Sequence, residues 1–527
     1  MKSDVLIIGA GGSGLVAAIS AHKNGAKVRV ITKEYPTRSQ TCMAQGGINA
    51  ALGNAGEDSI EAHIKNTLKS AHGIANEEAV SFLCQSAPEA IQWLDNIGVN
   101  FSRTKESKIA QRKLGGASAA RACYAQDYTG LKILHTLYDR CLSLGIEILN
   151  EKYLLDYIVE DDCVYGAIVL DIRTGEVQKY ESSSLIIATG GYSRIYDKHS
   201  TNSNSTTGDG LAAAIRVGAR VSDMEFVQFH PTALKNSSVL ISESARGAGG
   251  FLLNSKGERF VNELLPRDEV ARAINDEIAK GENIFLDIRH LGEEFINEEL
   301  PQERKLAKLY ENVDPVYDLI PIKPVAHYTM GGIEVDKNSS TKIKGLYAVG
   351  ECANHRVHGA NRLGGNSLLE LVVFGKQAGE NASSYAKNLD KSLDDSTQLS
   401  SDKNFLSKVR AFSNEIDFYK IREELGDIFY TKVGISRKKE SLESSLVYVK
   451  DLLSKVHLMG VSDKSKIYNT NLIEFLEFKN MLEISRLVLK GAIARSESRG
   501  SHFREDFPSE DEKFKMHTIV DKDGVVS

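Results

Sequence analysis

Two histidines and several arginines stand in glycine-flanked segments, where side chains can reach a ligand. His230 lies in Gln-Phe-His-Pro-Thr, and His327 opens His-Tyr-Thr-Met-Gly-Gly. Arg267 belongs to Pro-Arg-Asp-Glu-Val-Ala-Arg, and Arg362 to Ala-Asn-Arg-Leu-Gly-Gly. Taken singly, each histidine has an ordinary interpretation as a core residue and each arginine as part of a surface ion pair. Together they favour a site for a dicarboxylate, because the planar guanidinium fork matches carboxylate geometry.

The N-terminal residues predict a second binding site. Residues 5–8 form an apolar run suited to a buried strand, GxGxxG follows at Gly9, Gly11 and Gly14, and an alanine-rich segment through residue 21 has helical spacing. The first glycine permits the tight turn, the second lets backbone amides approach a pyrophosphate, and the third lets helix and strand pack closely. This order favours a dinucleotide site over a plain glycine-rich turn, with phosphates at the positive end of the helix dipole.

The elements that must position these residues follow an α/β order. Residues 27–31, 185–191 and 345–351 read as further buried strands of the sheet that begins at residue 5. The pattern becomes shorter and mixed at about residue 232 and almost wholly helical after about residue 386. We therefore predict an α/β protein with a Rossmann-type dinucleotide-binding domain (residues 1–231 and 345–385), an inserted α+β capping domain (232–344) and a C-terminal helical domain with a tail (386–527).

Two stretches outside these motifs carry expectations about local structure. Residues 58–97 read as helices, with Pro88 near the start of the second helix, where a proline is tolerated. Residues 497–508 are polar and read as an irregular tail.

Composition narrows the class of protein. The chain has 527 residues, of which 42% are hydrophobic and 26% charged, so it reads as a soluble globular protein of several domains. Its net charge of −6 gives no reason to expect nucleic acid as a partner. No apolar run approaches the ~18 residues that span a bilayer, and the early first strand leaves no room for a signal peptide. We expect a cytoplasmic protein, or one held at the cytoplasmic face of the membrane by partner subunits.

The segment after the second strand points to a family. Residues 36–52 read Pro-Thr-Arg-Ser-Gln-Thr-Cys-Met-Ala-Gln-Gly-Gly-Ile-Asn-Ala-Ala-Leu. With the histidine and arginine segments, they resemble the flavoprotein subunits of succinate dehydrogenase and fumarate reductase, a likeness that runs from residue 4 to about residue 517. The acid that would hold a ribose is missing at the end of the second strand, where Thr32 and Lys33 match the Ser/Thr-Lys pair of this family. The resemblance implies FAD as the cofactor.

The resemblance also implies roles for individual residues. Arg267 would transfer a proton in the interconversion of fumarate and succinate, with Glu243 relaying protons toward solvent. An arginine that acts only as an electrostatic clamp is the alternative. The substrate carboxylates would be bound by His230, Ser242, His327 and Arg362. The residues implied in binding FAD are Gly9, Gly11, Gly12, Gly14, Thr32, Lys33, Ser39, Gln40, Thr41, Gly46, Gly47, Asp209, Glu351, Ser367 and Leu368.

Two positions depart from the pattern of the family. Gln40 stands where membrane-bound members carry a histidine bonded to the flavin. We therefore expect non-covalent FAD. Leu114 stands where an aromatic residue is usual, in a loop at residues 111–121 that is shorter than in typical members. That difference puts substrate selectivity near the loop in doubt.

Two other functions remain open on the sequence alone. L-aspartate oxidase shares the fold and a non-covalent flavin, although Met330 and the tail resemble the reductase branch. A non-catalytic flavin electron-transfer subunit would keep the glycine motifs without needing the dicarboxylate residues. The six cysteines are scattered without a CxxC pair, which predicts reduced thiols and no bound metal. We therefore expect any iron–sulfur cluster in a partner subunit, with a membrane-associated subunit as a further possible partner.

Overall fold

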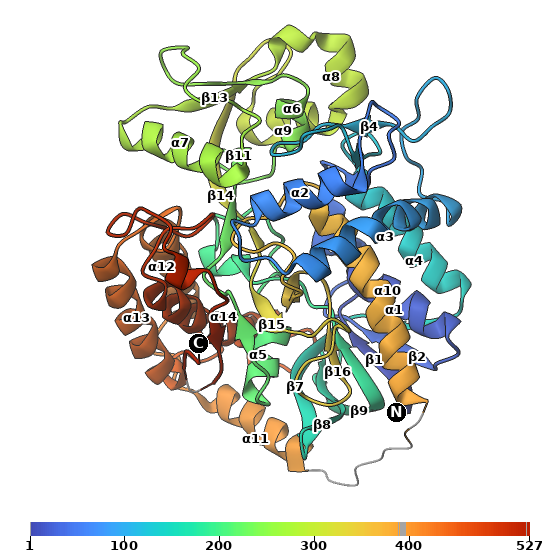
Figure 1. Ribbon diagram of the computed structural model, residues 1–527. Coiled ribbons are helices and arrows are strands. Elements are labelled where there is room, and N and C mark those ends of the chain that lie inside the picture. Colours follow the sequence, from blue (N-terminus) through green and yellow to red (C-terminus); the bar gives the residue numbers. More distant parts are fainter. Residues whose placement is uncertain (1, 388, 390–396, 523, 527) are drawn as a thin grey trace.

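A computed structural model describes residues 2–387, 389, 397–522 and 524–526. Figure 1 shows a sheet flanked by helices, a smaller lobe that contains β13 (Ile284–Asp287) and α8 (Glu293–Glu299), and a group of helices on the side of the C-terminus. The α/β class expected from the sequence is confirmed. The division into three domains at the residues given above stays a prediction.

The large sheet brings the carboxyl ends of its parallel strands to one edge. Its order is β6-β2-β1-β9-β8-β7, and β16 pairs with β9. β1 is parallel to both neighbours, with Val5 opposite Val28 on one side and Ser184 on the other. Ligands of such sheets bind outside these carboxyl ends. The strands are β1 (Lys2–Ile8), β2 (Val28–Ile31), β6 (Glu147–Leu149), β7 (Lys152–Glu160), β8 (Cys163–Asp171), β9 (Val177–Ile187) and β16 (Leu346–Ala348).

One face of this sheet is covered by α1 (Gly12–Lys23) and α10 (Asn366–Ala386), which pack closely on each other. Gly379 of α10 permits the approach, because a Cβ there would lie 2.4 Å from the carbonyl oxygen of Ala17. The neighbouring helices are α2 (Ile60–Ser70), α3 (Glu77–Asn96) and α4 (Thr129–Ser143).

The position of Pro88 differs from the expectation. It lies in the middle of α3 rather than near the start of a helix. An interior proline costs about 3 kcal/mol, because it removes one backbone hydrogen bond and crowds the preceding turn. The buried face of α3, which includes Leu83, Ile91 and Leu94, offsets that cost through packing.

The smaller lobe is built on an antiparallel sheet of order β11-β14-β13-β12. Two long strands connect the lobe to the rest of the molecule (Figure 1), and His230 and His327 lie on them. The elements are β11 (Val227–Leu234), α6 (Glu243–Gly247), β12 (Phe251–Leu253), α7 (Arg267–Ala279), α9 (Pro301–Glu311) and β14 (Ile320–Thr329).

The C-terminal helices pack against β7 and α5 (Asp209–Arg216) through one continuous apolar cluster. They are α11 (Thr397–Ala411), α12 (Phe418–Lys432), α13 (Lys439–Ser454) and α14 (Thr470–Ala494). Short strands complete the fold: β3 (Ile48–Asn49), β4 (Gln111–Arg112), β5 (Ala122–Cys123), β10 (Val221–Ser222), β15 (Gly332–Glu334), β17 (Ala353–Asn354), β18 (Ser436–Arg437), β19 (Phe503–Arg504) and β20 (Ile519–Val520).

The first part of the polar segment after α14, residues 495–504, is largely buried, whereas residues 505–508 are exposed. Glu497 has no exposed surface, and its carboxylate pairs with Arg495 at 2.9 Å and with Arg499 at 2.7 Å. Arg495 also pairs with Glu225 at 2.7 Å. Buried charges persist when they are paired in this way, so the charged side chains of the segment join it to the interior.

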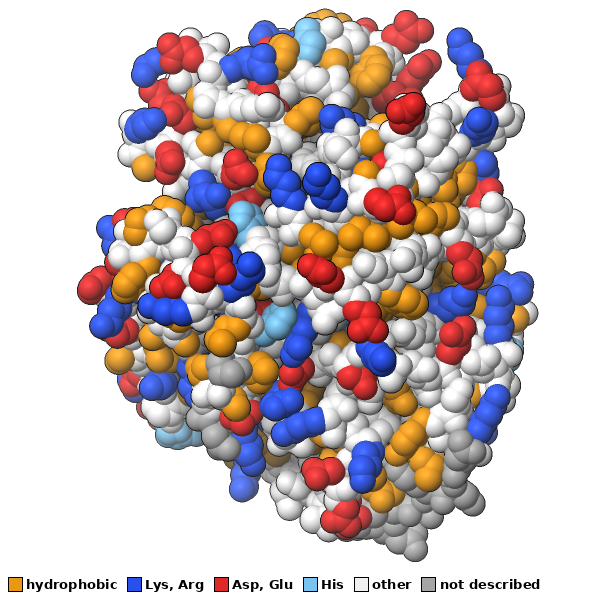
Figure 2. Space-filling model, in the orientation of Figure 1, with side chains coloured by type: hydrophobic (Ala, Val, Ile, Leu, Met, Phe, Trp, Pro, Cys, Tyr) orange, Lys and Arg blue, Asp and Glu red, His pale blue; other side chains and the backbone are white. Residues whose placement is uncertain are grey.

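Lysine and arginine side chains alternate with acidic ones over the face shown in Figure 2. This face therefore carries no continuous basic surface of the kind that binds nucleic acid. Among the helices of the described residues, the structure has none with the length and apolarity of a bilayer span.

Candidate active site

One cavity unites the two predicted sites. Its volume, counted together with the open space at its mouth, is about 1590 Å³. The glycine loop after β1 lines one end, and the histidine and arginine segments line the other. Of the residues predicted from the sequence to bind cofactor or substrate, all but Gly14 line this cavity.

The glycines have different structural roles. A Cβ at Gly14 would lie 2.1 Å from the carbonyl oxygen of Gly9, so Gly14 permits the contact between helix and strand, as expected. A Cβ at Gly11 would have Thr41 Oγ1, at 3.6 Å, as its nearest neighbour among the described residues. Gly11 is therefore open toward the cavity, at the N-terminus of the 12-residue helix α1. This arrangement fits the pyrophosphate of a dinucleotide.

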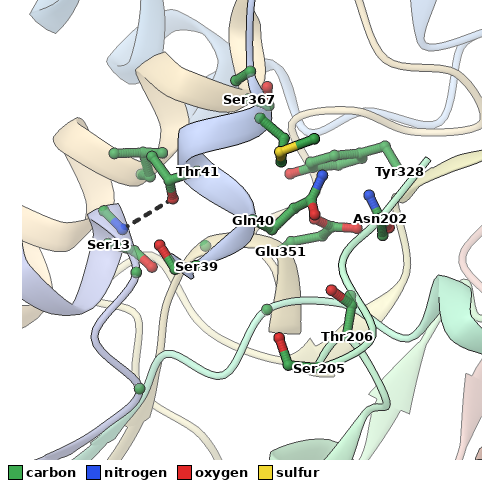
Figure 3. Close-up of a pocket in the computed structure, with 18 of the residues that line it drawn as sticks. Ser13, Ser39, Gln40, Thr41, Asn202, Ser205, Thr206, Tyr328, Glu351 and Ser367 are labelled. Carbon is green, nitrogen blue, oxygen red and sulfur yellow. Dashed lines mark hydrogen bonds between the residues drawn. The ribbon is translucent and has the colours of Figure 1, made fainter. Parts of the chain in front are cut away.

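Polar side chains surround the middle of the cavity (Figure 3). Ser39 and Thr41 lie on one side, and Gln40 lies beside Glu351 on the other. Gln40 Oε1 accepts a hydrogen bond from the backbone N–H of Ser203 at 2.7 Å, which fixes its carboxamide. Burial raises the pKa of Glu351 to about 7, although Thr329 donates two hydrogen bonds to Glu351 Oε1.

Lys33 and Asp209 line the cavity and also pair with each other. Lys33 Nζ lies 2.7 Å from Asp209 Oδ2 and 2.6 Å from Oε1 of Glu477 on α14. Burial alone would lower the pKa of Lys33, but the two carboxylates raise it above its ordinary value. This cluster joins the cofactor end of the cavity to the C-terminal helices, a link that the sequence motifs did not indicate.

The other end of the cavity contains a buried arginine–glutamate pair. Glu243 Oε2 accepts from Arg267 Nε at 3.0 Å and from Nη2 at 2.6 Å. Its Oε1 accepts from the backbone N–H of Gly115 at 2.9 Å and lies 3.6 Å from Arg246 Nη2. Burial opposes ionisation of Glu243, but the two guanidiniums lower its pKa below the ordinary value. Glu243 is therefore an anion held between two cations.

The two histidines face each other across this end, with ring centroids 4.9 Å apart. His230 Nδ1 lies 3.2 Å from the backbone nitrogen of Thr232, and His327 Nδ1 lies 2.8 Å from Thr201 Oγ1. These contacts leave Nε2 of each ring for a ligand. Burial, and then the positive charge of Arg267, lower the pKa of both histidines well below the ordinary value. Both rings are neutral at physiological pH.

Arg362 is buried beside the histidines. Its guanidinium lies over the ring of Tyr328, 4.3 Å from the centroid, and its Nη2 donates to Gln228 Oε1 at 3.0 Å. Burial, followed by repulsion from Arg267, lowers the pKa of Arg362 to about 10. Its Nε has no hydrogen-bond partner in the part of the chain that the structure describes, so it is available to an anion.

Ser242 and Leu114 complete the lining at this end. Ser242 is the N-cap of α6, and its Oγ accepts from the N–H of Ser244 at 3.1 Å. Leu114 has 2% exposed surface and precedes the glycine that binds Glu243. The short loop thus contacts the acid expected to relay protons.

Sequence reasoning did not identify Gln228 or Tyr328. Gln228 has no exposed surface and contacts both Arg267 and Arg362, and Tyr328 supports Arg362. The sequence contained a weak indication of both residues. Gln228 precedes His230 by two positions on one strand, and Tyr328 is the neighbour of His327.

Comparison with known proteins gives the family. The model of an FAD binding domain matches residues 4–368, and that of the fumarate reductase flavoprotein C-terminal region matches residues 422–526. The 8-methylmenaquinol:fumarate reductase flavoprotein subunit of Wolinella succinogenes is 40% identical, over 99% of this chain and 88% of its own. The succinate dehydrogenase flavoprotein subunit of Rickettsia conorii is 38% identical, over 100% of this chain and 94% of its own.

Comparison with solved structures indicates the same family. A variant of quinol fumarate reductase from E. coli superposes with a TM-score of 0.95 at 36% identity, covering 99% of this chain and 95% of its own. These matches do not favour L-aspartate oxidase or a non-catalytic electron-transfer subunit. They identify an FAD-dependent oxidoreductase, and the glycine loop described above fits that cofactor. The chain belongs to the family of succinate dehydrogenase and fumarate reductase flavoprotein subunits.

Proposed function

We propose that this protein interconverts fumarate and succinate with FAD, as the catalytic subunit of a fumarate reductase or succinate dehydrogenase. The observation that carries the proposal is the cavity itself. Arg267 and Arg362 converge with two neutral histidines at one end of it, and the glycine loop and α1 lie at the other. This arrangement supports binding of a small dianion beside a dinucleotide.

The charges of the site suit a dicarboxylate. Two buried guanidiniums, those of Arg246 and Arg267, pair with the carboxylate of Glu243, and a third, that of Arg362, is buried at the same end of the cavity. A dianion would compensate the excess positive charge in a region of low dielectric constant. The neutral imidazoles of His230 and His327 would add hydrogen bonds to the carboxylates without adding charge.

Bound FAD supplies the hydride-transferring group, and the residues of the chain orient the substrate and handle the proton. Arg362 would hold one carboxylate, so that the olefinic carbons stay in a fixed position, which can contribute roughly 7–11 kcal/mol to lowering a barrier. Arg267 would give a proton to the carbon that receives no hydride. Its contact with Glu243 at 2.6 Å supports a role for that carboxylate in returning the proton.

The proposal is tested with the FAD-loaded chain. We expect fumarate to oxidise a chemically reduced redox dye in its presence, and we expect L-aspartate to leave an oxidised dye unchanged. The oxidation of the reduced dye is followed by its absorbance, with boiled protein as the control. An FAD-loaded chain that oxidises L-aspartate and does not reduce fumarate would contradict the proposal.

We also propose that FAD is bound non-covalently. Gln40 lines the cavity, and its amide is neither a nucleophile nor free to move, because Ser203 holds its oxygen. Acid precipitation of the purified holoprotein is therefore expected to release the yellow chromophore into the supernatant, as absorbance near the flavin band will show. Flavin that remains with the denatured polypeptide would refute this expectation.

Electrons must reach the flavin from a partner, which we propose to be an iron–sulfur subunit. All six cysteines are free thiols in the structure, and in the described part of the chain no cluster of histidine, cysteine and acidic side chains could hold a metal. A membrane-associated subunit would place the assembly at the cytoplasmic face. Purification from the native host is expected to recover both partners. If the purified single chain reduces fumarate at full rate with the physiological electron donor, these partner subunits are not required.

A further inference from the structure

Arg267 and Arg362 pose an electrostatic problem. Both guanidiniums are buried and face the same cavity, and the repulsion contributes to the lowered pKa of Arg362. Two like charges in a region of low dielectric constant move apart unless other groups hold them. Of these two arginines Glu243 contacts only Arg267, since within the described part of the chain its partners are Arg267, Arg246 and the backbone of Gly115.

The carboxamide of Gln228 lies between the two guanidiniums. Its Oε1 accepts from Arg267 Nη1 at 3.0 Å and from Arg362 Nη2 at 3.0 Å. Its Nε2 donates to Asn361 Oδ1 at 2.7 Å and to the backbone oxygen of Arg362 at 2.8 Å. The orientation of the amide is therefore determined, because a flipped amide would turn its NH₂ group toward two cations.

A second contact closes this network into a ring. Asn361 Nδ2 donates to Asp268 Oδ1 at 2.8 Å, and Asp268 is the neighbour of Arg267 at the start of α7. The ring thus runs from α7 through Gln228 on β11 to the segment that carries Arg362. It connects the smaller lobe to the main body beside the end of the cavity that is proposed to bind the substrate.

We propose that Gln228 is a positioning residue that sets the separation and orientation of the two substrate-facing arginines. A neutral acceptor is suited to this task, since it satisfies one N–H of each guanidinium without cancelling their charge. Nε of Arg362, which has no partner among the described residues, remains for a carboxylate. This inference rests on the proposed function and adds to it the residue that fixes the spacing of the two cations.

The test replaces Gln228 in the holoprotein by methionine, which keeps the approximate volume but removes the acceptor. Gln228→Met is expected to lower kcat for fumarate reduction at least tenfold and to weaken malonate binding at least tenfold, while FAD content stays unchanged. Kinetics with a reduced dye and titration of the flavin spectrum with malonate measure the two effects. Gln377→Met is the control, because Gln377 lies on α10 outside the cavity and bonds Ser339.

If Gln228→Met fails to retain flavin, the same measurements are made on Gln228→Asn. The shorter amide of asparagine stays polar but cannot bridge both guanidiniums, so the same losses of kcat and malonate affinity are expected. Malonate affinity also shows whether Gln228 acts by positioning the two arginines or only by supporting the fold. In the Arg362→Lys background, Gln228→Met should cost less affinity than in the wild type, because coupled residues are not additive. Wild-type kcat and malonate affinity in Gln228→Asn, or full additivity, would overturn the inference. An inactive wild type would instead refute the proposed function.

Discussion

Arg267→Lys should lower kcat for fumarate reduction by about 10³-fold, a loss comparable to removal of a major group that stabilises a transition state. Arg267 uses Nε and Nη2 to bind Glu243 and Nη1 to bind Gln228. A lysine ammonium keeps the charge but cannot make this planar set of contacts. Because the changed interaction acts in the transition state, KM should change much less than kcat. Steady-state kinetics with a reduced dye and flavin titration with malonate measure both.

Arg362→Lys is the matched control for Arg267→Lys. Its guanidinium is held by Tyr328 and Gln228 and is proposed to clamp a carboxylate, so this change should weaken malonate binding by about tenfold or more as well as slow turnover. If Arg267→Lys instead raises KM with little loss of kcat, Arg267 is an electrostatic clamp. Near-normal turnover would remove Arg267 from the mechanism.

Gly14→Ala should lower the stability of the protein and Gly11→Ala its affinity for FAD, although both change the same glycine motif. At Gly14 the new methyl group would lie 2.1 Å from the carbonyl oxygen of Gly9. β1 is paired on both sides and cannot yield, so the free energy of unfolding of the flavin-free protein should fall by about 3 kcal/mol. At Gly11 the methyl group has room within the protein but projects into the cavity.

Gly11→Ala should therefore leave the stability of the flavin-free protein within about 0.5 kcal/mol of the wild type. Its FAD dissociation constant should rise at least tenfold, or about 1.4 kcal/mol. Urea unfolding of the flavin-free protein and fluorescence titration with FAD separate the two quantities. Gly524→Ala is the control, because its new Cβ would meet only a lysine side chain at 3.8 Å. Wild-type FAD affinity in Gly11→Ala would show that the phosphates bind elsewhere.

The sequence by itself determined the parts of the protein that depend on local patterns. The apolar run, the glycines and the alanine-rich segment predicted β1, the turn and α1, because strand and helix formation and the tight turn involve neighbouring residues. The segments around His230, His327, Arg267 and Arg362 were also recognised from the sequence. All four side chains line the cavity in the structure, and their catalytic and binding roles stay predictions.

Only the tertiary structure decided which of these side chains hold each other. Lys33 bonds Glu477 across 444 positions of the chain, and Gln228 bonds Arg362 across 134. No periodicity in the sequence reports such a contact, because it depends on how separate elements pack. The same reason explains Pro88, where burial of the whole face of α3 outweighed a local preference. Local propensities predicted the elements, and long-range packing and paired buried charges placed the functional groups.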